Sequence, residues 1–127
     1  MNVRMLVWSI AGLGALLVAA APVFAHHSFA MFDMQKEVTA KGVVKEFQWT
    51  NPHSWVQIEI KNDKGATEEW ALEALSPNVL SRMGWKRNSL KAGETITVVY
   101  HPARDGSHGG HLVNVTLADG TTIGGVQ

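Results

Sequence analysis

Six histidines are the residues of this chain best suited to hold a metal ion or a small ligand, and they occupy positions 26, 27, 53, 101, 108 and 111. Imidazole is the commonest metal ligand in proteins, and imidazoles without thiolates suit copper or zinc. The sequence contains no cysteine, so a thiolate metal site and a disulfide scaffold are both excluded. The candidate metal ligands are His26, His27, His53, His101 and His111.

These imidazoles can share one ion only if the fold brings the ends of several strands together. Each also has a structural explanation: a solvated amino terminus for His26 and His27, a turn for His53, a strand end for His101 and the mouth of a barrel for His111. The sequence leaves the metal and the structural interpretations open.

Aromatic side chains gather at a predicted turn, where Trp49, Asn51 and Trp55 lie within seven residues of one another. Aromatic rings beside a polar turn can form a recognition surface, although they can equally form the corner of a small core. Trp85 follows Gly84 and has the same two interpretations, since it can contact a ligand or plug the end of a barrel. The candidate ligand-binding residues are Trp55, Asn51 and Trp85.

The first 25 residues are typical of a cleaved secretory signal, with Arg4 before an apolar run, Pro22 near its end and the small residue Ala25 at the predicted cut. The alternative is an uncleaved membrane anchor, which the glycines and alanines of the run disfavour. Cleavage would place the domain in the periplasm or outside the cell, with no membrane segment. The mature chain would begin at His26, whose free amine and ring nitrogen together chelate Cu(II).

Charge and motifs restrict the classes of function. The chain has 11 Lys and Arg against 11 Asp and Glu, whereas a protein that binds a nucleic-acid backbone needs clustered positive charge. We therefore expect no nucleic-acid partner. Ser107 beside His108 lacks the pattern of a nucleophile elbow, so we expect no enzymatic activity.

The mature chain predicts a mainly β domain in which a short helix, between Ser76 as N-cap and Gly84 as C-cap, follows the third of five strands. In the first strand the apolar residues move from one face to the other before Phe47. This change predicts a β-bulge, which Gly42 would permit. The predicted strands span residues 36–49, 53–61, 67–75, 94–101 and 111–117.

Alternation along the strands predicts which side chains are buried. In the third strand the core face carries Trp70, Leu72 and Ala74, and in the fifth it carries Val113, Val115 and Leu117. The three glutamates of the third strand are expected on a solvated face, and they are Glu68, Glu69 and Glu73.

The order of three strands, a helix and two strands is that of an OB-fold, a five-stranded Greek-key barrel, and a simple meander is the alternative. We expect a signal helix over residues 1–25, an arm over 26–36 on which Phe29 and Phe32 pack against the barrel, and the barrel over 37–119. Residues 120–127 are expected to form a fraying tail.

Four segments, HHSFAMFD, EFQWTNPHSW, SPNVLSRMGWKRNSLKAGE and HPARDGSHGG, resemble DUF6152, a family of small exported bacterial proteins of unknown function. The resemblance spans the mature region and implies export and a small β-barrel-like domain, without established catalytic residues. The strand order is also similar to that of periplasmic OB-fold domains that bind small ligands, an analogy of fold alone.

Two functions follow as expectations. The first is an exported OB-like module that binds a metal ion or a small ligand through its histidines. The second is a protein-interaction or structural module of the cell envelope, in which Trp55 and Trp85 form an apolar contact patch.

Overall fold

The structure is a computed structural model that describes residues 27–124. The predicted signal helix and His26 lie outside this range, as do residues 125–127. Within the described range, no helix has the length and apolar character needed to cross a membrane. The elements are α2 (His27–Ala30), β1 (Val38–Gln48), β2 (Trp55–Lys61), β3 (Thr67–Glu73), α3 (Pro77–Arg82), β4 (Thr95–Pro102), β5 (Gly109–Thr116) and β6 (Thr122–Ile123).

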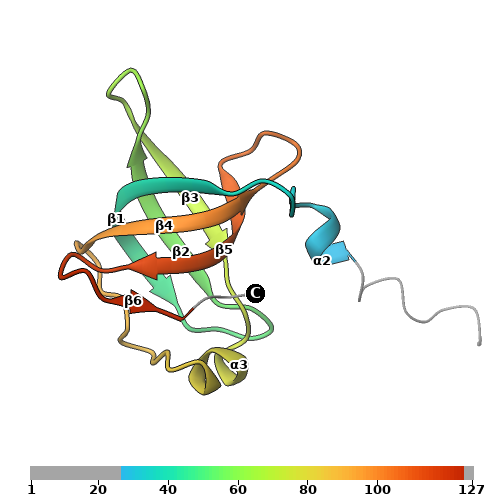
Figure 1. Cartoon of the computed structure of the whole chain (residues 1–127), viewed down its shortest axis with the longest axis vertical. Helices are drawn as coiled ribbons and strands as arrows, with labels where there is room; N and C mark the ends of the chain where they lie inside the picture. Colours follow the sequence, from blue (N-terminus) through green and yellow to red (C-terminus); the bar gives the residue numbers. More distant parts are fainter. Residues whose placement is uncertain (1–26, 125–127) are drawn as a thin grey trace, which may run out of the picture.

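The strands form one sheet in the order β3-β2-β1-β4-β5-β6 that curls into a barrel (Figure 1). Closure comes from a parallel contact between β3 and β5, in which Ala71 opposes Gly109 and Glu73 opposes His111. A meander would pair neither β1 with β4 nor β3 with β5, so that alternative is wrong. The predicted five-stranded OB-like barrel, with one short helix between its third and fourth strands, is confirmed.

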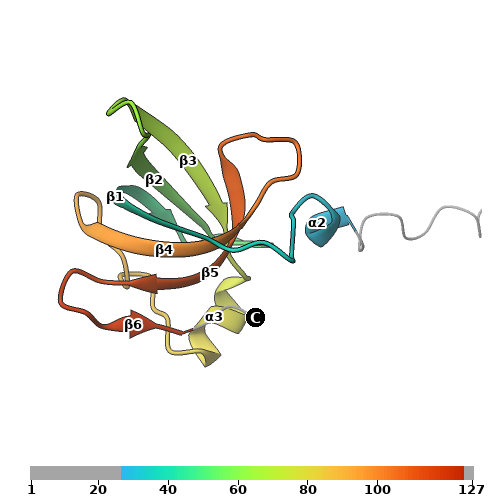
Figure 2. The same ribbon diagram turned by 45° about the horizontal axis from the view of Figure 1, so that its top comes forward.

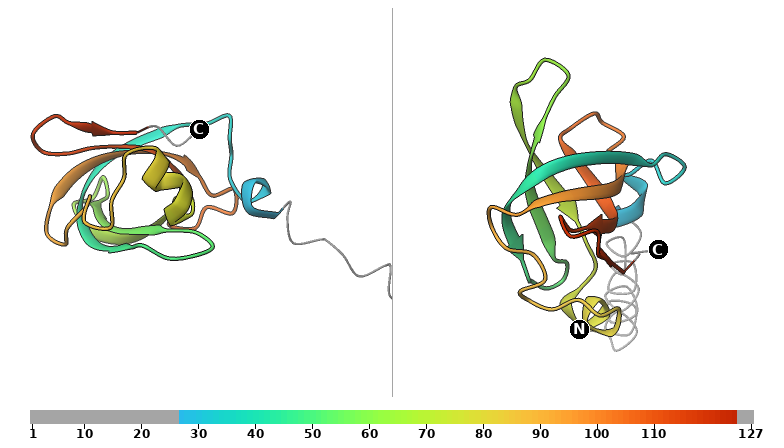
Figure 3. Two further views of the ribbon diagram at one scale, coloured as in Figure 1. Left: turned by 90° about the horizontal axis from the view of Figure 1, so that it is seen from below. Right: turned by 60° about the vertical axis from the view of Figure 1, so that its left-hand side comes forward.

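The core fills the inside of this barrel with aliphatic side chains from all five long strands. Leu80 of α3 and Trp85 just after it close one end, and each is at most 1% exposed. Figure 3, seen from below, shows α3 lying across that end. The strand residues that are less than 2% exposed are Val44, Val56, Ile58, Leu72, Ile96, Val98, Leu112 and Val115.

The bulge predicted in the first strand is present, because the register of β1 against β2 shifts between Val44 and Glu46. Gly42 has another role than the predicted one. A Cβ at Gly42 would overlap the carbonyl oxygen of Glu59 and lie 2.9 Å from the Ile58 side chain. Glycine therefore lets β2 pack closely against β1, and the bulge forms beyond it.

A second register shift lies in the pairing of β4 with β5, where Val99 opposes Asn114 and Tyr100 opposes Leu112. Val113 has no partner in this ladder and is only half-buried, while Leu112 is fully buried. The predicted burial of Val113 is therefore wrong, because the bulge reverses the alternation on which it was based.

The end of the chain is more ordered than expected as far as it is described. Ile123 pairs with Val115 and Thr122 pairs with Thr116, so β6 extends the sheet beside β5 (Figure 2). The fraying predicted from residue 120 onward is therefore wrong for these two residues, since they have backbone partners.

We predict that Gly42→Ala destabilises the barrel by about 1–3 kcal/mol, because the added methyl overfills the contact with β2. Gly109→Ala is the matched control, since its Cβ would lie 3.5 Å from the carbonyl oxygen of Ala71, an ordinary contact. Chemical denaturation of both variants measures the difference. Equal stability of the two variants would contradict the proposed role of Gly42.

Candidate functional site

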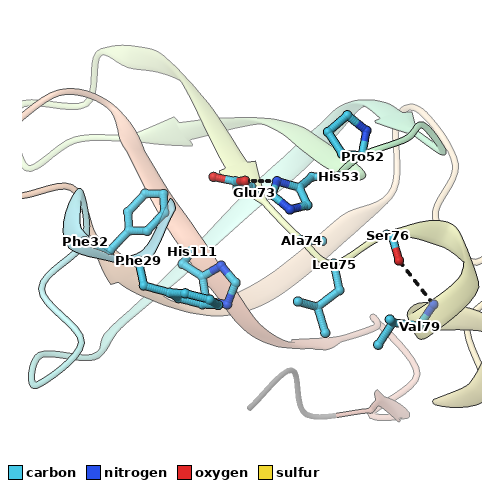
Figure 4. A pocket seen from close by; sticks show the side chains of 10 residues that line it. All are labelled: Phe29, Phe32, Pro52, His53, Glu73, Ala74, Leu75, Ser76, Val79 and His111. Atoms are coloured by element: carbon cyan, nitrogen blue, oxygen red, sulfur yellow. Dashed lines mark hydrogen bonds and ion pairs between the residues drawn. The ribbon is translucent and has the colours of Figure 1, made fainter. Parts of the chain in front are cut away.

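A pocket of about 310 Å³ lies at the end of the barrel where β3 ends and β5 begins (Figure 4). The arm supplies one side of it and α3 supplies the other. The residues that line the pocket are Phe29, Phe32, Pro52, His53, Glu73, Ala74, Leu75, Ser76, Val79 and His111. Most are apolar, so the few polar side chains decide its chemistry.

Backbone hydrogen bonds beyond the ends of β2 and β3 bring His53 beside Glu73. Trp55 opposes Glu73 at the end of the ladder between β2 and β3. The backbone pairing extends beyond it, since Ser54 N donates to the carbonyl of Leu75 (3.0 Å) and Ala74 N donates to that of Ser54 (2.8 Å). His53 Nδ1 then pairs with Glu73 Oε1. The side chain of Glu73 is 10% exposed and that of His53 is 37% exposed, so the pair reaches from the barrel end to the surface.

Glu73 lines the pocket, a position that the sequence analysis missed. It was expected on a solvated face with Glu68 and Glu69, but it is only 8% exposed because the parallel contact with β5 covers it. Glu69, on the same strand, has a side chain that is 67% exposed, in agreement with that expectation. The available signal was the hairpin register, which places Glu73 opposite Trp55 and therefore near His53.

His111 is buried in the opposite wall of the pocket and is 4% exposed. The ring of Phe29 meets it edge-on at 5.3 Å and the ring of Phe32 lies 5.8 Å away. Burial lowers the pKa of His111, and the nearby His101 and His53 lower it further. Its imidazole is therefore uncharged at neutral pH and has one nitrogen lone pair that can accept a hydrogen bond.

His101 fastens the arm and does not line the pocket. Its ring stacks behind His111, with 6.5 Å between the ring centroids. His101 Nδ1 lies 2.8 Å from the carbonyl oxygen of Lys36, and because a carbonyl only accepts, this nitrogen carries the proton and donates. The imidazole thus ties the end of the arm to β4.

Three further hydrogen bonds fix the arm against the end of β4 and the loop that follows it. Asp33 N donates to the carbonyl of Pro102 (2.9 Å), and Arg104 N donates to that of Met31 (2.9 Å). Arg104 Nε also donates to the carbonyl of Phe32 (3.0 Å), whose ring is 5% exposed. Packing of the predicted arm against the barrel through Phe32 is therefore observed, and Phe29 covers the rim of the pocket.

The predicted metal ligands are only partly brought together. His53 and His111 line the pocket, whereas His101 lies behind His111. His26 is outside the described residues, and of His27 only the backbone, at the start of α2, is described. Among the side chains that the structure describes, no group of three or more His, Asp or Glu is placed to hold a metal ion. The described histidines alone do not form the predicted metal centre.

The predicted ligand-binding residues Trp55, Asn51 and Trp85 do not line the pocket. Trp85 is 1% exposed and packs 5.7 Å from the ring of Phe47, so it plugs the barrel and is inaccessible to a ligand. The predicted contact patch of Trp55 with Trp85 is wrong for the same reason. Asn51 is exposed in the loop before β2, and Trp55 is half-buried on that strand.

The model of a family described as "Family of unknown function (DUF6152)" matches residues 15–113, which is more than half of the chain. The chain belongs to the DUF6152 family. No curated protein matches this DUF6152 chain.

One solved structure similar to this DUF6152 protein is a mitochondrial single-stranded DNA binding protein from S. cerevisiae, Rim1. The two chains share 12% identity with a TM-score of 0.50, and the match covers 65% of this chain and 93% of Rim1. At this identity the likeness shows the fold alone.

The similarity to Rim1 contradicts our expectation, which was based on net charge, that the chain has no nucleic-acid partner. A protein named for binding single-stranded DNA has the same fold, so the neutral net charge of this DUF6152 chain does not decide its class of partner.

We predict that buried His111 makes stability depend on pH. The folded protein holds this imidazole uncharged, while the unfolded chain takes up a proton below about pH 6.5, so the unfolded state binds more protons and stability falls as the pH drops below that value. His111→Phe removes this part of the dependence, and His108→Gln, which removes an exposed imidazole, is the control. Denaturation midpoints at several pH values measure the slopes. An unchanged slope in His111→Phe would refute the assignment.

Proposed function

We propose that this chain is an exported, non-enzymatic module that binds a small ligand in the pocket between its arm and its barrel. The pocket itself carries the proposal. Its volume of about 310 Å³ is in the range of small-molecule sites, which are mostly apolar and have a few convergent polar groups. His53, Glu73 and His111 are those groups.

The fixed arm supports a binding role. A ligand in this pocket contacts Phe29 and Phe32, and their segment is held by the hydrogen bonds to Pro102, Arg104 and His101. Because this wall is already fixed, little conformational entropy of the protein is lost when a ligand binds. The pocket is thus suited to bind without a large rearrangement.

We favour binding over catalysis because Ser76 and His53, two polar residues of the pocket, already have partners within the protein. Ser76 is the hydroxyl residue among those that line the pocket, and its Oγ accepts a hydrogen bond from Val79 N (3.4 Å) as the N-cap of α3. His53 Nδ1 is engaged by Glu73. A hydrolytic site would instead need a nucleophile directed at its base, so we propose a role in holding a ligand.

Export to the periplasm or the exterior is the second part of the proposal. The leader over residues 1–25 has the charged start, apolar run and small residue at the cut that signal peptidase requires. The predicted cut after Ala25 lies four residues before Phe29, which lines the pocket. Processing would therefore leave a free amino terminus three residues before this wall.

We predict that the exported protein begins at His26 and that this terminus chelates copper. Cu(II) should bind the processed protein more tightly than a variant with one additional Ala before His26, because the chelate needs the free amine and imidazole of the same residue. Mass spectrometry identifies the terminus, and calorimetric titration compares the two proteins. Equal affinities would show that the terminal amine takes no part.

We predict that Val79→Trp fills the pocket and prevents binding, since Val79 lines it from α3 and is 37% exposed, so a larger side chain can be tolerated. Asn78→Trp adds the same ring to the neighbouring exposed position, which does not line the pocket, and should retain binding. Benzyl alcohol, a small neutral aromatic compound, serves as the probe. NMR titration should shift the amide signals of His53, Glu73 and His111 in the native protein and in Asn78→Trp. Their constancy in the native protein with benzyl alcohol and with its charged analogues benzylammonium and benzoate would contradict the proposal.

A further inference from the structure

The polar atoms that reach the pocket are mainly hydrogen-bond acceptors. Glu73 has an ionisable carboxylate, which accepts hydrogen bonds and donates none when charged. Uncharged His111 has one ring nitrogen that accepts a hydrogen bond and one that donates. A ligand that carries several N–H donors matches this set better than a ligand with acceptors alone.

The pairing of His53 with Glu73 decides which nitrogen of His53 a ligand can contact. A carboxylate only accepts, so His53 Nδ1 carries the proton that it donates to Glu73 Oε1. When His53 is uncharged, its second nitrogen, Nε2, then has a free lone pair. Figure 4 shows the imidazole of His53 between Glu73 and Ala74, with His111 across the pocket.

Permanent positive charge is absent from the described lining, since none of the ten residues is Lys or Arg. Arg104, which contacts the arm, is engaged by the carbonyl of Phe32 and lies 4.0 Å from the carboxylate of Asp33. An anion would therefore meet the carboxylate of Glu73 without a permanent counter-charge. An organic cation would place a full positive charge beside Glu73, whose partner His53 is charged only when it is protonated.

The apolar walls select an organic cation over a bare ion. Phe29 and Phe32 form one side and Leu75 and Val79 the other, so most of a ligand's surface would contact carbon (Figure 4). Aromatic faces also attract cations. A metal ion needs a set of three or more close ligands, and residues 27–124 do not assemble one.

We propose that the ligand is a small organic ammonium, a primary amine on an apolar body. Its ammonium group donates to Glu73 and to the imidazoles of His53 and His111, and its body packs against Phe29 and Val79. This inference rests on the proposed function, because it assigns a chemical class to the ligand of the same pocket.

Three probes of nearly equal size test the class: benzylammonium, benzyl alcohol and benzoate. NMR titration of the processed protein should give benzylammonium an affinity at least about tenfold above that of benzyl alcohol, with benzoate the weakest. Glu73→Gln keeps the shape of the side chain and should remove this preference. Glu69→Gln, which changes an exposed glutamate of the same strand, should preserve it.

The outcomes separate the class of ligand from the function. If benzyl alcohol or benzoate binds as tightly as benzylammonium, the ammonium assignment is wrong while the pocket stands as a binding site. If none of the probes shifts the signals of the pocket residues, both proposals are overturned. If Zn(II) or Cu(II) displaces benzylammonium stoichiometrically and Glu73→Gln abolishes that metal binding, the pocket is a metal site instead. Should Glu73→Gln fail to fold, the ranking of the three probes on the native protein decides alone.

Discussion

The parallel contact between β3 and β5 is the constraint on which the site depends. It closes the barrel, and it does so at a position where one strand carries a glutamate and the other a histidine, so Glu73 and His111 are both covered. Closure therefore has an electrostatic consequence. A carboxylate withdrawn from water needs a partner, and the short link between β2 and β3 supplies one by placing His53 beside it.

The arm and α3 convert this closed end into a pocket. On the arm side, backbone and side-chain hydrogen bonds to β4 and to the loop after it hold Phe29 and Phe32 in place. On the other side, Ser76 caps a helix too short to be stable alone, and burial of Leu80 anchors it to the barrel. The space between them persists because both walls are attached independently to the same core.

The fold could be predicted from the sequence because its strands alternate regularly and its helix has clear caps. The errors arose where alternation is interrupted. The bulge at Val113 reverses the phase of β5, and only the pairing partner on β4 reveals it. Trp85 was ambiguous because a tryptophan after a helix can fill the end of a barrel or contact a ligand at the surface. Its burial in the structure decides for the first.

The site was less predictable, since its residues come from segments that are far apart in the sequence. Sequence patterns identified His53 and His111 as candidates but gave no distance between them. Glu73 shares its strand with the half-buried Glu68 and the exposed Glu69, and the burial that distinguishes it comes from a strand nearly forty residues later. Long-range contacts of this kind leave no trace in the local pattern.

The way in which the arm is attached bears on how the pocket lining can diverge among related chains. Its main-chain carbonyl and amide groups make most of the contacts to β4 and the following loop, so the path of the arm depends little on which side chains it carries. A change at Phe29 would then alter the lining of the cavity without dislodging the segment. The lining of the pocket can therefore change separately from folding, by single substitutions on a segment that is anchored through its backbone.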